Sequence, residues 1–263
     1  MESYKRSFEE LRSRFHLAQK ASRNLTLIDP ATAAIPVAYC THSIAEMGGD
    51  FIGLVNVKNG CDILVADVAG HDMAAFMYTM LIKAFFEENS RKELPGETLL
   101  FLLNNAIQNA SLDMVSDPRL VSAVFIHVDL QSKCANIVSA GHPPAVLIDR
   151  ENNRLAPVFS QGSILGISPD TTYIPVKLDF KPGNRLLVYT DGLANACRID
   201  GPTGKELRLS PAGIDQLIME FFRTDLKSMT DSIWQGVLDF CHNKLDDDTS
   251  LLTIEFPEGK QNV

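Results

Sequence analysis

One short stretch of the sequence constrains the fold most, because it has the pattern of a β-hairpin with an acid at each free end. Two apolar, β-branched runs flank Asn59-Gly60, which is a strong signal for a hairpin turn. A two-residue turn there would place Asp50 and Asp67 at the same end of the hairpin, within a step or two of each other. Facing carboxylates repel each other across adjacent strands. The pair therefore favours a bound divalent cation. The alternative is that both acids merely end their strands and their carboxylates point into water.

Two further acidic sites stand at the ends of predicted strands. One predicted strand runs into Asp191, and the last predicted strand follows Asp246-Asp247-Asp248. Hard divalent ions prefer oxygen ligands of this kind. Acids that are distant in the sequence but share one edge of an antiparallel sheet would build such a site.

The remaining pattern predicts helices between groups of strands. Two consecutive helices after the hairpin, followed by a return to strands, are typical of helices laid on one face of an antiparallel sheet. Strands are predicted near residues 36–41, 120–129, 135–139, 144–149, 185–190 and 250–256. Helices are predicted at 72–88, 96–110 and 229–243, and a further helix is predicted to begin at Ser210, which caps it, with Pro211 in its first turn. In the first helix, the predicted buried face consists of Met73, Phe76, Met77, Met80, Leu81 and Phe85, with Asp72 at the positive end of the helix dipole.

Composition and charge limit the class of protein. With 263 residues, of which 45% are hydrophobic, the chain can form one large domain with a substantial core. Its net charge of −9 argues against a nucleic-acid binder. The five cysteines are scattered, which is typical of buried thiols in a reducing compartment such as the cytoplasm. No signal peptide is seen, and the longest apolar run, residues 73–86, is too short to span a membrane.

The first part of the chain reads as a helix with a weak coiled-coil seam. In residues 4–25, apolar side chains recur at alternating steps of three and four. This helix either packs on the domain or serves as a linker or dimerisation helix that joins it to an upstream regulatory module. The expected division is therefore a linker or dimerisation helix at residues 1–30 and one domain at residues 31–258.

Several short motifs resemble, in order along the chain, those of a known family. The family is the PPM-type (protein phosphatase 2C-like) serine/threonine phosphatases, in the bacterial branch typified by SpoIIE and RsbU. The motifs are Gly48-Gly49-Asp50-Phe51, Ala66-Asp67-Val68-Ala69-Gly70-His71, Ser139-Ala140-Gly141-His142-Pro143-Pro144, Gly162-Ser163-Ile164-Leu165-Gly166, Tyr189-Thr190-Asp191-Gly192-Leu193 and Asp246-Asp247-Asp248-Thr249.

The resemblance implies an α+β fold, a four-layer α-β-β-α sandwich with two Mn²⁺ or Mg²⁺ ions at one edge. By resemblance, Asp67 bridges the ions and the Val68 carbonyl completes one coordination sphere. By the same resemblance, Asp50 belongs to the coordination shell of the first metal ion, partly through water. Asp191 and Asp246 bind the other side of the pair, with Asp247 as the alternative to Asp246.

The function implied by the resemblance is hydrolysis of phosphoserine or phosphothreonine on a regulatory protein by metal-bound hydroxide. The implied substrate is a phosphorylated anti-sigma factor antagonist of the STAS type, and the implied regulator is an upstream sensor or receiver domain of two-component signalling. Two alternatives remain: a phosphatase-like adaptor that binds a partner without catalysis, and a two-metal nuclease, which the acidic charge disfavours. No P-loop is present.

Two histidines and one acid near these motifs have other expected roles. His71 is expected to act beside the metal ligands or to cap a helix, and His142 to be structural; neither is a predicted metal ligand. Ala69 and Asp72 stand where Ser and Gly are common in this branch. The extra acid could tune metal affinity or repel an acidic partner.

Overall fold

Two five-stranded antiparallel sheets form the centre of the domain in the computed structural model, which describes residues 28–44, 48–113, 119–201 and 204–257. The helix predicted at residues 4–25 lies outside the described residues. One sheet has the order β2-β3-β4-β5-β8 and the other β1-β12-β9-β6-β7. The strands of the first sheet are β2 (Asp50–Val57), β3 (Gly60–Val68), β4 (Val121–Asp129), β5 (Cys134–Ala140) and β8 (Val176–Asp179). Those of the second are β1 (Val37–His42), β12 (Thr249–Glu255), β9 (Arg185–Tyr189), β6 (Ala145–Asp149) and β7 (Arg154–Val158).

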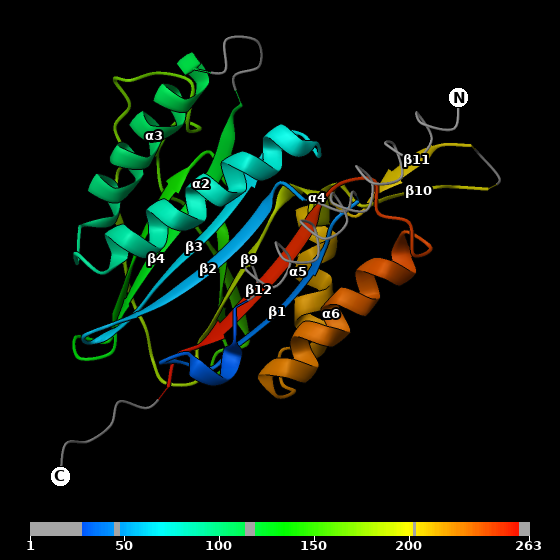
Figure 1. The fold of residues 1–263 in the computed structure, drawn as a ribbon. Helices are drawn as coiled ribbons and strands as arrows, with labels where there is room; N and C mark the ends of the chain where they lie inside the picture. Colours follow the sequence, from blue (N-terminus) through cyan, green and yellow to red (C-terminus); the bar gives the residue numbers. More distant parts are fainter. Residues whose placement is uncertain (1–27, 45–47, 114–118, 202–203, 258–263) are drawn as a thin grey trace, which may run out of the picture.

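A pair of helices covers the outer face of each sheet, so the predicted α-β-β-α sandwich is confirmed (Figure 1). Helices α2 (Met73–Ser90) and α3 (Gly96–Asp113) pack on the first sheet, and α5 (Ser210–Phe221) and α6 (Leu226–Phe240) pack on the second. The smaller elements are η1 (Pro30–Thr32), α4 (Asp191–Asn195) and the hairpin of β10 (Cys197–Ile199) and β11 (Glu206–Arg208). None of the helices in the described ranges has the length and apolar character needed to cross a bilayer.

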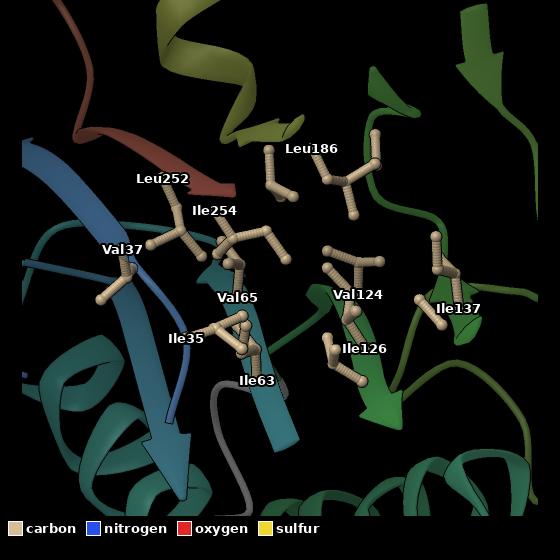
Figure 2. Packing of buried hydrophobic residues seen from close by; sticks show 14 of the residues in the cluster. Ile35, Val37, Ile63, Val65, Val124, Ile126, Ile137, Leu186, Leu252 and Ile254 are labelled. Carbon is tan, nitrogen blue, oxygen red and sulfur yellow. The ribbon is translucent and has the colours of Figure 1, made fainter. Parts of the chain in front are cut away.

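The sheets meet through a dry layer of branched aliphatic side chains. Figure 2 shows Val65 and Val124 of the first sheet facing Leu186, Leu252 and Ile254 of the second. All of these side chains are at most 1% exposed. Each such side chain contributes about 2 kcal/mol by leaving water. This layer fixes the distance between the sheets, and hence the spacing of the loops at their ends.

The hairpin of β2 and β3 carries the two acids as predicted, but its turn differs by one residue. Val57 pairs with Gly60, so the turn residues are Lys58 and Asn59, and the predicted Asn59-Gly60 turn is wrong. Gly60 belongs to β3 because it pairs with Val57 in β2 and Asp129 in β4, and glycine is needed there because a side chain would clash with the backbone carbonyl of Val128. The shift places Asp50 directly opposite Asp67.

The buried face predicted for α2 is correct only in part, because Leu81 and Phe85 pack against the core but the other predicted residues are not among the core residues. The buried side chains include Ala75, Tyr78, Thr79, Ile82 and Phe86, whereas the predicted Met73 and Met77 are 42% and 50% exposed. The inner face accepts polar groups because they have partners: the Tyr78 hydroxyl lies 2.9 Å from the Ser111 hydroxyl, and the Thr79 hydroxyl donates to the Gly49 carbonyl at 3.2 Å. Hydrogen-bonded polar groups can occupy a buried face without a large desolvation penalty.

The start of α5 also differs from the predicted cap. Leu209 is the capping residue, no side chain caps the helix, and Ser210 lies in the helix with a φ of +64°. Leu209 is buried in the core beneath the helix, so packing overrides the capping preference of serine.

Candidate active site

The site begins with a row of three polar residues across neighbouring strands of one sheet. Asp50 in β2 pairs with Asp67 in β3, which pairs with Ser122 in β4. Directly paired residues in antiparallel strands point to the same face. The adjacent Val68 and Val121 belong to the core beneath α2 and α3, so the polar row points to the opposite face, between the sheets.

The second sheet contributes acids where β9 ends and β12 begins. These neighbouring antiparallel strands bring Asp191, in the first turn of α4, close to Asp247, just before β12. Asp67, Asp191 and Asp247 all line one cavity of about 540 Å³. The remaining lining residues are Ala69, Gly70, Leu120, Ser122, Gly141, His142, Pro143 and Ile164. The structure thus brings together acids from both sheets.

Burial and mutual repulsion raise the pKa values of the acids in the first sheet. Burial raises the pKa of Asp67 to about 7, and the carboxylates of Asp191, Asp247 and Asp248 add to the rise. The pKa of Asp50 is well above its usual value because of burial and then repulsion by Asp67. The raised pKa values of Asp50 and Asp67 indicate that the negative charge of the site is not balanced by positive groups of the protein.

The contacts of Asp50 support the same conclusion. Its Oδ2 accepts a hydrogen bond from the Thr190 hydroxyl at 2.8 Å, which links the two sheets. Its Oδ1 is buried and has no hydrogen-bond partner among the described residues. A buried carboxylate oxygen without a partner is costly, and a cation would satisfy it.

The three consecutive aspartates before β12 have three different surroundings. Asp246 is exposed, and its side chain contacts Lys244 at 3.2 Å and the Cys197 thiol at 3.4 Å rather than the cavity. Asp247 lines the cavity. Asp248 is 4% exposed and accepts backbone hydrogen bonds from Ile44 at 2.8 Å and Gly49 at 2.6 Å. The geometry therefore favours Asp247 over Asp246 as the acid that faces a ligand.

Two glycines allow the motifs to approach one another. A side chain at Gly49 would clash with the Val68 carbonyl, and a side chain at Gly192 would clash with the Asp248 carbonyl. Gly49 therefore lets β2 lie tightly against the end of β3, where the Val68 amide donates to the Gly49 carbonyl at 3.2 Å. The Val68 carbonyl, a ligand implied by the resemblance, lies at this junction and is not among the groups that line the cavity.

A divalent cation fits this site by charge and by donor type. The donors are carboxylate oxygens, with an unsatisfied oxygen on Asp50 and a raised pKa on Asp67. Within the described ranges, no three histidine, cysteine or carboxylate groups form a compact cluster by themselves. Water, backbone or substrate oxygens would therefore complete the coordination of an ion, as is common for Mg²⁺.

An arginine that the sequence pattern did not reveal holds the segment after Asp67. The Arg119 guanidinium donates to the Ala69 carbonyl at 2.9 Å and to Asp72 Oδ2 at 2.6 Å. Asp72 also accepts from the Ala75 amide at 3.0 Å as the cap of α2, and that bond, followed by Arg119, lowers its pKa. Asp72 is thus engaged in structural contacts beside the cavity.

The two histidines differ in exposure. His71 is exposed, and it lies close enough to Asp247 to oppose the rise that burial causes in the pKa of that acid. His142 is 7% exposed, and burial lowers its pKa to about 3. His142 is therefore neutral at physiological pH.

The role of Asp248 as a clamp can be tested by its effect on stability. Asp248→Ala leaves two backbone N–H groups near the site without their acceptor, which is expected to lower the free energy of unfolding by about 3 kcal/mol. Urea unfolding in the presence of a chelator measures this change. Asp246→Ala is the matched control and is expected to change stability by less than about 0.5 kcal/mol, because its ion pair is exposed. Equal stability of the two variants would contradict the assignment.

The sandwich of two antiparallel sheets, with acids from both sheets around one cavity, defines a PPM-type (protein phosphatase 2C-like) domain. The model of the family described as Stage II sporulation protein E (SpoIIE) matches residues 58–257. The chain belongs to this family, so the predicted SpoIIE/RsbU branch is confirmed.

Similar proteins agree with this assignment. The chain is 22% identical to "Phosphoserine phosphatase RsbU" of Bacillus subtilis, over 94% of this chain and 71% of that protein. It is also 22% identical to "Phosphoserine phosphatase RsbP" of the same organism, over 67% of this chain and 44% of that protein. The fold resembles the SiaA-PP2C domain of Pseudomonas aeruginosa, with a TM-score of 0.77, 17% identity and coverage of 97% of this chain and 100% of that one. It also resembles RsbX in complex with magnesium, with a TM-score of 0.59, 16% identity and coverage of 83% and 93%.

Proposed function

We propose that this chain is a divalent-metal-dependent phosphatase that hydrolyses phosphoserine or phosphothreonine on a protein. The observation that carries the proposal is the gathering of carboxylates from both sheets at one cavity, where repulsion and partial burial raise the pKa values of Asp50 and Asp67, because such a set is unfavourable without cations. The names of RsbU and RsbP as phosphoserine phosphatases support the choice of substrate class.

In this proposal the chain supplies the ligands and the shape of the reaction site. Asp67, Asp191 and Asp247 hold the cations from both sheets, with Asp50 beside Asp67. When bound, two Mn²⁺ or Mg²⁺ ions would offset the repulsion between these acids, lower the pKa of a water toward neutrality and neutralise charge on the phosphoryl group.

The rest of the cavity serves the substrate. Leu120, Pro143 and Ile164 line it beside the acids, and Leu120 is 38% exposed. This apolar rim can contact the chain that carries the phosphorylated residue while the phosphoryl group enters among the polar residues. The proposed substrate is a phosphorylated STAS-type anti-sigma factor antagonist, and an upstream sensor or receiver domain is the proposed regulator.

Phosphate release from a phosphoserine protein tests the proposal. With Mn²⁺ we expect turnover, and removal of the ion by a chelator is expected to lower it at least about 100-fold, since metal ions supply several kcal/mol of transition-state stabilisation. Incubation with DNA and RNA is the control, and neither is expected to be cut. Tight binding of a phosphoprotein without Mn²⁺ binding or turnover would favour a non-catalytic adaptor and contradict the proposal.

A further inference from the structure

Thr190 lies where the two sheets meet beside the acids, between the end of β9 and the start of α4. It is 0% exposed, and its amide donates to the Ser250 carbonyl of β12 at 3.0 Å. Its own carbonyl accepts from the Leu193 amide at 3.0 Å, within the turn that opens α4. The main chain of Thr190 is therefore fixed on both sides, and it leads directly into Asp191.

The hydroxyl of Thr190 is not used to cap its own helix. Thr190 is the N-cap residue of α4, where a threonine oxygen commonly accepts a hydrogen bond from an amide of the first turn. It accepts none from α4, every residue of which the structure describes. Instead, the hydroxyl accepts from the Ser250 amide at 2.8 Å and donates to Oδ2 of Asp50 at 2.8 Å. The side chain is thus turned toward an acid of the other sheet.

The bond from the Ser250 amide fixes the direction of the hydroxyl hydrogen. A threonine hydroxyl has one hydrogen and two lone pairs, a backbone amide can only donate, and an ionised carboxylate can only accept. With Asp50 ionised, the Thr190 hydrogen must therefore lie toward Oδ2. Burial, and then repulsion by Asp67, raise the pKa of Asp50, whereas hydrogen bonds from the Ser250 and Thr190 side chains lower it because they favour the ionised form.

Holding Oδ2 determines what the second oxygen of Asp50 can do. Oδ1 is buried and has no hydrogen-bond partner among the described residues. Asp50 lies directly opposite Asp67, on the face of the sheet where the acids gather. Oδ1 is therefore the oxygen that remains for a cation or for water bound to a cation. Groups that hydrogen-bond to metal ligands fix the orientation of those ligands.

We infer that Thr190 is a positioning residue of the metal site, whose hydroxyl holds Oδ2 of Asp50 so that Oδ1 is presented to a divalent cation. The inference rests on the proposed metal-dependent function and adds to that site a residue that does not itself contact the ion. Thr190 acts on Asp50 through its side chain and on Asp191 through its main chain. One residue thereby relates acids of the two sheets.

Calorimetric titration of the metal-free protein with Mn²⁺ tests the inference. Thr190→Val has the shape of threonine without the hydroxyl, and it is expected to weaken Mn²⁺ binding about tenfold or more, as loss of a partner of a metal ligand does. Thr190→Ser keeps the hydroxyl and is expected to keep most of the affinity. Unchanged affinity in Thr190→Val, or an equal loss in Thr190→Ser, would overturn the inference.

The matched control is Thr230→Val in α6. Thr230 is also 0% exposed, and its hydroxyl donates to the Leu226 carbonyl at 2.8 Å and contacts the Thr253 hydroxyl. None of these residues lines the cavity. Both valine variants are expected to lower the melting temperature in a chelator, because each removes a buried hydroxyl from its partners. We expect weaker Mn²⁺ binding in Thr190→Val alone, and an equal loss in Thr230→Val would show a general effect of stability and overturn the inference.

A second substitution tests whether Thr190 acts through Asp50. In a protein that carries Asp50→Ala, the further change Thr190→Val is expected to alter Mn²⁺ affinity by a much smaller factor than in the unmodified chain, since the carboxylate that it holds is absent. The same loss in both backgrounds would show that Thr190 acts by another route and would contradict the inference.

These measurements separate the inference from the proposed function. If the unmodified chain binds Mn²⁺ but releases no phosphate from phosphoproteins, the proposed function fails, and the calorimetry still decides the role of Thr190. If it binds no Mn²⁺, both fail. If it does both and Thr190→Val binds Mn²⁺ with unchanged affinity, only the inference about Thr190 fails. The expected result is a phosphate release by Thr190→Val that recovers as the Mn²⁺ concentration is raised, because a weakened site can still be filled.

Discussion

Asp67→Asn is expected to reduce Mn²⁺-dependent phosphate release at least about 1,000-fold while making the ion-free protein more stable. The loss of activity follows because the variant removes a central carboxylate from a metal site that supplies several kcal/mol of catalysis. The gain in stability follows because partial burial and repulsion by Asp191, Asp247 and Asp248 raise the pKa of Asp67 to about 7. Phosphate release and calorimetric unfolding measure the two effects.

The pH dependence of stability gives the sign of the second effect. The pKa of Asp67 is higher in the folded protein than the value of about 3.9 for an unfolded chain, so its contribution is favourable at low pH and is lost as pH rises toward about 7. The difference between the folded and unfolded pKa values of Asp67 corresponds to a change of at most about 4 kcal/mol in the free energy of unfolding. With a chelator present, the melting temperature of the wild type should fall between pH 5 and pH 8.

The Asp67→Asn variant should show a smaller decrease over the same range, and Mn²⁺ should stabilise the wild type more at pH 8 than at pH 5. An ion-free variant that is less stable than the wild type at pH 8 would contradict the electrostatic account. Full turnover in the variant would contradict the assignment of Asp67 to the reaction.

Asp247→Asn is expected to lower phosphate release about 100-fold, whereas Asp246→Asn should change it less than about threefold. The reason is geometric, because Asp247 lines the cavity with Asp67 and Asp191, and Asp246 contacts Lys244 and Cys197. The two substitutions are chemically identical and one residue apart, so each serves as the control for the other. Phosphate release at several Mn²⁺ concentrations measures the difference.

Excess Mn²⁺ should partly restore phosphate release by Asp247→Asn, since a metal site with weakened affinity can still be filled at a high concentration of the ion. The reverse order of the two variants would show that the implied role of Asp246 as a metal ligand is correct and that the geometry described above is not. Equal, small effects would place neither acid in the site.

Local patterns predicted most of the strands and the end of the hairpin that holds the acids, whereas the four-layer sandwich was implied by the family resemblance. Alternating apolar residues and turn signals located most strands, and the hairpin placed Asp50 near Asp67. The turn position was wrong by one residue because Gly60 is needed for contact with β4, which a local pattern does not encode. The edge strands β7 and β8 were not predicted, since most of their side chains are exposed or only partly buried and they carry no continuous apolar run.

The finer features of the site depend on contacts between distant segments. Asp246, Asp247 and Asp248 are identical in type, and only their surroundings in the folded chain distinguish them. Ser122 carries no motif, and its place beside Asp67 follows from the β3–β4 register. His142 could be located by its motif, but its hydrogen bond with Ser122 joins β4 to the turn after β5, and the sequence pattern does not show this contact. The predicted inner face of α2 was correct only in part for the same reason, because its buried polar groups, Tyr78 and Thr79, bond to Ser111 in α3 and to the Gly49 carbonyl before β2.

The most direct test of the central claim is the location of bound Mn²⁺ by anomalous X-ray scattering from crystals of the protein grown with the ion. We predict anomalous peaks in the cavity between Asp67, Asp191 and Asp247, and their loss in crystals of Asp67→Asn. Crystals of the wild type with no peak in this cavity at saturating Mn²⁺, or with peaks only elsewhere on the protein, would contradict the claim.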